Sequence, residues 1–118
     1  MQPDERDAAY LWDMLQICEE IADLLKEHDE AAFHDNRLLQ RAIERDVELV
    51  GETARTLSQV FRDAHPELAW REIIGIRNIL AHEYGRIDHA LLYHTATDDI
   101  PALATRLRLI LPAKEGKT

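Results

Sequence analysis

The chain has 118 residues, of which 46% are hydrophobic and 31% are charged, enough for one compact domain with its own core. With 4 Gly, 4 Pro and 2 Phe it has too few turn residues for a protein built from many short strands. A formal net charge of −9 disfavours non-specific binding to DNA or to an anionic membrane. A nucleic-acid site would therefore need a local cluster of Arg and His, or an oligomer.

The N-terminal segment and the cysteine content indicate where the chain is expected to reside. Residues 1–7 are acidic and lack the apolar stretch of a signal peptide. No apolar run approaches the roughly 20 residues that span a bilayer. Cys18 is the single cysteine, which argues against a disulfide scaffold. We expect a cytoplasmic protein without a membrane segment.

Apolar residues recur at three- and four-residue spacing along the chain, which predicts an all-α, up-and-down bundle of four or five helices. The predicted helices span about residues 3–26, 35–61, 66–84, 87–95 and 98–111, with Pro66 and Pro101 in first turns and Gly85 after the third helix. We expect residues 1–112 to form a single domain and residues 113–118 to be a polar tail.

The apolar stripe of each predicted helix, called its seam below, indicates which residues form the core. The inward-facing residues are Leu11, Met14, Leu15, Cys18, Ile21, Ala22 and Leu25, then Leu39, Ala42, Ile43, Val47, Val50, Ala54, Leu57 and Phe61, and finally Ala102, Leu103, Leu107, Ile110 and Leu111. Cys18 is followed by two glutamates, so we expect an unreactive core thiol. Asp46 lies close to the second seam and needs a partner, either a buried Arg or a dimer contact.

Other residue types suggest packing rather than chemistry. Trp12 and Trp70 are predicted to be core or interface anchors. Five histidines form no i, i+4 pair and have no converging acidic ligands, so we expect no metal site and no cofactor. They are His28, His34, His65, His89 and His94.

The third predicted helix carries a polar face. On a helical wheel Arg77, Asn78 and His82 lie opposite an apolar arc that we expect to face the core, formed by Ile73, Ile76, Ile79 and Leu80. Gly75 costs a helix about 1 kcal/mol relative to Ala, so it needs a reason. Small residues beside the polar face would let the same helix of a second copy approach. We therefore expect a homodimer in which two Arg77–His82 pairs face each other across a groove.

Arg and His side chains in such a groove suit cleavage of RNA. A neutral His82 can take the proton of a ribose 2′-OH, and its protonated form can protonate the leaving 5′ oxygen. Arg77 can bind the phosphate and stabilise the charge of the transition state. Asn78 could hold the imidazole tautomer or reach a phosphate. This chemistry needs no metal, although an Arg and a His at this spacing also occur by chance on many surface helices.

Residues 70–84, WREIIGIRNILAHEY, closely resemble the signature helix of the HEPN superfamily, and within it the HepT-like toxins. Their pattern is Arg, four residues, His, any residue and Tyr, which Arg77, His82 and Tyr84 fill. Asn78 is also the usual residue after the Arg. The resemblance implies a homodimeric, metal-independent ribonuclease. It also implies a toxin neutralised by a minimal nucleotidyltransferase (MNT) antitoxin, which transfers AMP from ATP to Tyr84.

Two functions stay open at this point. The first is an RNA endonuclease toxin with Arg77 and His82 as catalytic residues, controlled by AMP on Tyr84. The alternative is a non-catalytic helical module that docks the nucleotidyltransferase and is modified by it, because an acidic surface suits a basic protein partner at least as well as RNA. The expected partners are RNA, the MNT antitoxin and a second copy of the chain, with a larger assembly open.

Overall fold

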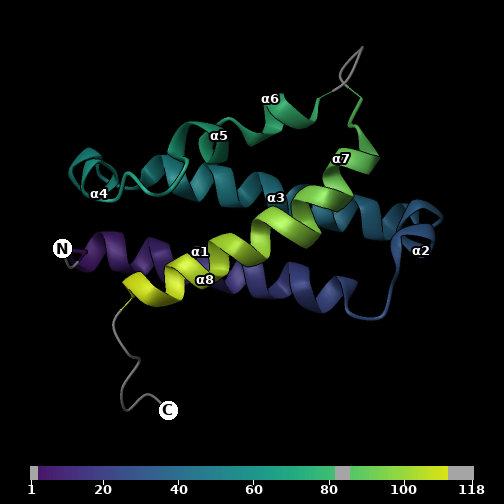
Figure 1. The fold of residues 1–118 in the computed structure, drawn as a ribbon, viewed down its shortest axis with the longest axis horizontal. Helices are drawn as coiled ribbons and strands as arrows, with labels where there is room; N and C mark the ends of the chain where they lie inside the picture. The colour runs from purple at the N-terminus through teal and green to yellow at the C-terminus, as the bar shows by residue number, and fades with distance from the viewer. Residues whose placement is uncertain (1–2, 82–85, 112–118) are drawn as a thin grey trace.

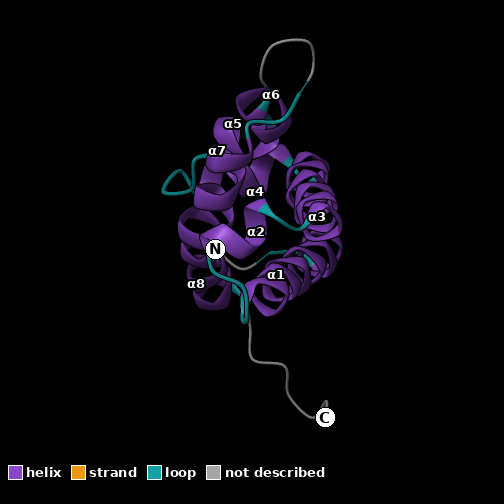
Figure 2. Ribbon diagram, turned by 90° about the vertical axis from the view of Figure 1, so that its right-hand side faces the viewer, coloured by secondary structure: helices purple, strands orange, loops and turns teal. Residues whose placement is uncertain are grey.

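The computed structural model describes residues 3–81 and 86–111 (Figure 1). Within these ranges the regular secondary structure is helical, apart from one isolated bridge between Ala81 and Ile87. The two longest helices, α1 (Glu5–Leu25) and α3 (Arg37–Thr56), run antiparallel and form one layer. The later helices cover that layer from one side (Figure 2). The prediction of an all-α bundle is confirmed.

Most helices begin at a side-chain cap. Asp4 accepts a hydrogen bond from the Asp7 amide at 2.7 Å, and Asn36 accepts one from the Leu39 amide at 3.0 Å. These caps start α1 and α3 within about two residues of the predicted positions. Asp29 caps a short helix that the sequence analysis missed, α2 (Glu30–His34), through the Ala32 amide at 2.9 Å.

The second predicted helix, residues 35–61, is two helices in the structure. α3 ends at Thr56, and Ser58 caps α4 (Gln59–Ala64). The buried carboxylate of Asp7 in α1 accepts hydrogen bonds from the Ser58 amide at 2.9 Å and from its hydroxyl at 2.6 Å. These tertiary hydrogen bonds keep the Ser58 amide out of the backbone hydrogen bonding of α3. The helix therefore stops there, even though the apolar periodicity continues.

The last two predicted helices, by contrast, are continuous. α7 (His89–His94) begins at the Asp88 cap and passes through a π-helical turn (Thr95–Asp99) into α8 (Ile100–Ile110). Asp99 makes no side-chain cap, so the prediction that a separate helix begins at about residue 98 is wrong. Pro101 has no amide hydrogen, and the wider turn before it accommodates the missing donor, so the chain does not need a new helix start.

The core lies between the two layers. The predicted seam residues of α1, α3 and α8 are buried in the main, whereas Ala22 and Ala102 are exposed. Cys18 is 2% exposed, which confirms its prediction as a core residue, and burial raises the pKa of its thiol to about 12. None of the described helices is long and apolar enough to cross a membrane.

Of the two partners considered for Asp46, a buried Arg or a dimer contact, the described residues do not supply the buried Arg. Its side chain is 8% exposed, and one carboxylate oxygen has no hydrogen-bond partner in the described part of the chain. Burial and the neighbouring Glu20 carboxylate raise the pKa of Asp46 to about 6, and Arg45 opposes this only weakly. The α1–α3 interface therefore holds a carboxyl group that takes up its proton at a higher pH than an ordinary aspartate does.

Candidate functional site

The motif segment is not one helix. α5 (Trp70–Ile74) and α6 (Ile76–Leu80) replace the predicted helix over residues 66–84, and Gly75 joins them. The Gly75 amide donates to the Arg71 carbonyl at 3.0 Å, while its own carbonyl accepts from the Asn78 amide at 3.0 Å. Gly75 thus has a role within its own chain, as the junction of two short helices.

A second glycine, which the sequence analysis overlooked, sets how closely this segment approaches α3. A Cβ atom on Gly51 would lie 2.8 Å from the Ile73 carbonyl oxygen and 3.2 Å from the Ile76 Cγ2 atom. The backbone of the α5–α6 junction therefore rests directly on α3 at a position where only glycine fits without a shift. A glycine in the middle of a long helix is itself a signal of such a contact, because it costs helix stability.

The helical conformation ends at Leu80, before the predicted end at Tyr84. Ala81 is extended and pairs with Ile87, and the Asp88 amide donates to the Leu80 carbonyl at 2.9 Å. The helical wheel used in the sequence analysis assumes that the helix continues past Leu80, and that assumption is wrong at Ala81. His82 and Tyr84, two of the predicted site residues, lie outside the described residues.

Arg77 and Asn78 are both exposed on α6, as the polar face predicted. The Arg77 side chain is 79% exposed, and its Nε atom lies 3.9 Å from a carboxylate oxygen of Glu48 on α3. Glu48 also faces the Arg45 guanidinium at 3.5 Å. A long ion pair of an exposed side chain contributes little stability. The Arg77 guanidinium is therefore positioned by α3 but still open to an anionic ligand.

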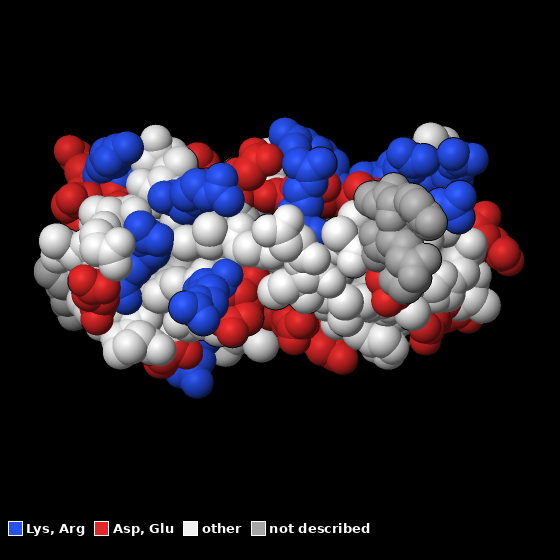
Figure 3. All heavy atoms as spheres, turned by 90° about the horizontal axis from the view of Figure 1, so that it is seen from above, with Lys and Arg blue, Asp and Glu red and all other residues white. Residues whose placement is uncertain are grey.

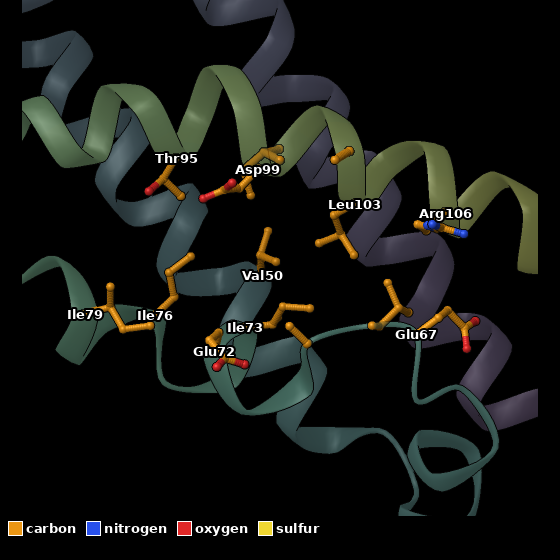
Figure 4. A pocket seen from close by; sticks show the side chains of 14 residues that line it. Val50, Glu67, Glu72, Ile73, Ile76, Ile79, Thr95, Asp99, Leu103 and Arg106 are labelled. Atoms are coloured by element: carbon orange, nitrogen blue, oxygen red, sulfur yellow. The ribbon is translucent and has the colours of Figure 1, made fainter.

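The other side of the segment lines an apolar groove of ≈ 430 Å³ between α5–α6 and α8 (Figure 4). Ile73 and Ile76 point into it and are half-buried, while Leu80 is fully buried. Ile79 also lines the groove but is 48% exposed, so its prediction as a core residue is wrong. The rim carries three acidic side chains and one basic one: Glu67, Glu72, Asp99 and Arg106.

The segment that leads into the motif is anchored by aromatic packing. The Trp70 indole donates to the His65 carbonyl at 2.9 Å, and its ring lies 6.1 Å from that of Phe61. This agrees with the expected anchoring role of Trp70. The Glu67 carboxylate lies 3.0 Å from the His65 imidazole, and a hydrogen bond from its own backbone amide, together with this contact, lowers the pKa of that exposed carboxyl group. Among the described residues, no three His, Cys, Asp or Glu side chains converge as metal ligands.

Comparison with known proteins shows similarity to one family of ribonucleases. Residues 14–110 match the family described as Ribonuclease HepT-like. A protein of Methanocaldococcus jannaschii named as a candidate RNase is 31% identical over 102 residues, which cover 86% of this chain and 94% of the relative. A protein of Thermococcus cleftensis named as a candidate ribonuclease HepT is 33% identical over 94 residues, or 80% of this chain and 86% of the relative. No solved structure matches significantly.

Proposed function

Because the chain belongs to the HepT-like family of ribonucleases, we propose that it is a metal-independent RNA endonuclease and the toxin of a toxin–antitoxin pair. The observation that carries this proposal is the exposed Arg77, held beside α3 by Glu48 and followed by the exposed Asn78. Its guanidinium has the planar donor geometry that binds a phosphate. Relatives that cover most of this chain are themselves named as candidate RNases.

The proposed reaction uses the 2′-hydroxyl of the RNA as nucleophile. His82 takes the proton of this hydroxyl while its oxygen bonds to phosphorus, and the bond from phosphorus to the 5′ oxygen breaks. A protonated His, from the same site or from the site of a second copy, gives a proton to the departing oxygen. Arg77 offsets the charge that builds on the phosphate oxygens. The products are a 2′,3′-cyclic phosphate and a 5′-hydroxyl end.

The proposed site is composite and is switched off by modification. Two copies of the chain would bring two Arg77 and two His82 side chains to one groove, with Asn78 orienting the imidazole or the phosphate. An MNT antitoxin would transfer AMP from ATP to Tyr84, all within the cytoplasm. The added phosphate would occupy the field of the cationic side chains, and the adenosine would block RNA sterically.

The first test measures cleavage of single-stranded RNA by the purified chain in the presence of EDTA. We expect His82→Ala to abolish cleavage and Arg77→Ala to reduce kcat/KM by about 10²–10³-fold, as removal of a transition-state donor does. Arg55→Ala is the matched control, because Arg55 is also exposed and lies near the far end of α3. Cleavage by His82→Ala at the parent rate would refute the proposed mechanism.

The groove beside the motif favours a second function, a non-catalytic module that docks a nucleotidyltransferase. Its apolar lining and mainly acidic rim suit a protein segment with apolar and basic side chains better than they suit RNA. Intact mass after co-expression with the neighbouring nucleotidyltransferase tests this, with Tyr84→Phe as control. A gain of AMP units without any RNA cleavage by the unmodified chain would support the docking module over the nuclease.

A further inference from the structure

A second pocket, of ≈ 380 Å³, lies where α2, the start of α3 and the start of α7 meet. Polar side chains form its lining, namely His34, Asp35, Arg37, Gln40, Arg41 and His89. Nothing in the proposed mechanism uses these residues. The lining combines two guanidinium and two imidazole groups with a single carboxylate, which gives the pocket a local positive charge on an acidic chain.

The two arginines of this pocket have no ligand within the described residues. Arg37 and Arg41 lie one turn apart on α3, both exposed, and neither makes an ion pair or hydrogen bond in that part of the chain. Arg45, one turn further along, is paired with Glu48 and Glu52. Arg37 occupies the first position of the helix, where the helix dipole disfavours a positive charge. An arginine at this position therefore does not serve the stability of the helix. Binding of an anion would account for it.

The wall of the pocket is rigid. Gln40 is 8% exposed, and its side-chain amide donates to the Phe33 and His34 carbonyls, each at 3.0 Å. Phe33 is fully buried and lies 5.3 Å from the Tyr93 ring of α7. These contacts fix α2 against α3 and α7. A preformed pocket loses little entropy when it binds a ligand.

The acidic groups near the pocket do not cancel its charge. Glu30 lies 3.4 Å from the outer nitrogen of His34 and is not part of the lining. Asp35 is in the lining, but it is one carboxylate beside two guanidinium groups. A phosphate would pair with the arginines and accept hydrogen bonds from His34 and His89.

The pocket lies on the path that leads away from Arg77. Arg41 precedes Glu48, the partner of Arg77, by seven residues on the same helix, which is about 10 Å along its axis. His89 begins α7 two residues after Ile87, the partner of Ala81 in the bridge that follows the motif. Lys and Arg side chains lie along the face that carries α5 and α6, including the end toward this pocket, and are interspersed there with Asp and Glu (Figure 3). An RNA strand bound at Arg77 could thus reach the pocket within a few nucleotides.

We propose that this pocket binds a backbone phosphate of the RNA substrate, a few nucleotides from the bond that is cut. Arg37 and Arg41 would hold the phosphate, and His34 and His89 would donate hydrogen bonds to it. The inference rests on the proposed function, since it assumes RNA as the ligand. It predicts that the enzyme gains affinity from substrate length as well as from the cleaved bond.

The binding test uses the full chain with His82→Ala, which leaves the RNA uncut, and single-stranded RNA of graded length. The Arg41→Ala and Arg37→Ala substitutions, each added to this background, should weaken binding of long RNA. Combined, the two substitutions should also reduce the magnitude of the slope of log K against log salt by about 0.7, the value for one lost phosphate contact on a single strand. Arg55→Ala is the control, and thermal melting verifies that each variant is folded. A slope equal to that of the control would overturn the proposal.

A kinetic test separates this pocket from the catalytic site. With otherwise unaltered chain, Arg41→Ala should raise KM for long RNA several-fold and leave kcat and dinucleotide cleavage unchanged. If neither the unaltered chain nor any variant cleaves RNA, but the substitutions still reduce the salt dependence of RNA binding, the pocket is supported and the proposed nuclease activity is refuted. If the substitutions weaken binding of the antitoxin and leave RNA binding unchanged, the pocket serves a protein partner and our proposal is wrong.

Discussion

α3 and the α5–α6 segment pack against each other, but they hold their shapes in different ways. α3 is a helix of 20 residues with a side-chain cap at its start and a continuous buried seam. α5 and α6 have five residues each and no side-chain cap. Helices this short are not stable alone, so the segment depends on its contacts with α3. The region with the candidate chemistry is therefore the one that most needs a neighbour.

Among substitutions that test the packing of the α5–α6 segment against α3, Gly51→Ala is expected to have the largest effect. The new methyl group would lie 2.8 Å from the Ile73 carbonyl oxygen, so the motif segment would have to move away from α3. We expect a loss of about 2 kcal/mol in the free energy of unfolding, even though Ala favours the helix itself. Urea denaturation measures the loss, and hydrogen exchange should show it as weaker protection of α5 and α6.

Gly75→Ala is the matched control for that substitution. Its methyl group would meet the Arg71 carbonyl oxygen at 3.2 Å, a tight but more tolerable contact. We expect a change within about 1 kcal/mol. If Gly51→Ala proved as stable as the parent, the motif segment would not rest on α3 as closely as described.

An intermediate effect is expected at the buried Asp46, on the α1 side of α3. Its folded-state pKa of about 6 exceeds the ordinary value of 3.8, so the stabilisation it provides is complete below about pH 4 and is lost as the pH rises through 6. Asp46→Asn should remove this loss and raise the stability at pH 7 by about 1–2 kcal/mol. Denaturation curves at pH 4, 6 and 7.5 measure it. A variant that keeps the parent's pH dependence would contradict this explanation.

The smallest effect on stability is expected from Glu48→Gln, which removes the carboxylate between Arg45 and Arg77. Both pairs involve exposed arginines, so the free energy of unfolding should change by less than about 1 kcal/mol. Under the proposed function, freeing Arg77 should lower KM for RNA about two-fold. Glu52→Gln, which affects Arg45 only, is the control. A higher KM would mean that Glu48 positions Arg77 productively.

Local patterns account well for the long helices. Asp4 and Asn36 mark the starts of α1 and α3, and the apolar spacing identifies the buried apolar side chains of both, but not the buried Asp7, Gln40 and Gly51. Those features depend on neighbours along the chain, which a helical wheel represents correctly. The exposure of Arg77 and Asn78 follows from the same reasoning, because polar residues opposite an apolar arc face water.

The positions at which the helices break could not be predicted from local patterns. Ser58 leaves α3 because Asp7, 51 residues earlier in the chain, accepts two of its hydrogen bonds. α5 and α6 meet at Gly75 where α3 presents Gly51, and Ile79 reaches the edge of a groove instead of the core. Each of these outcomes depends on a residue distant in sequence, and periodicity contains no information about such a contact.

The sequence by itself determined the helical class, the seams of the long helices, the inert Cys18 and the family motif that contains Arg77. These are consequences of side-chain periodicity, local caps and residue identity. Only the tertiary structure decided where the helices stop, which acid faces Arg77, and that Arg37, Arg41 and His89 line one pocket. Packing brings residues from three helices together there, because burial of the shared core fixes how α2, α3 and α7 meet.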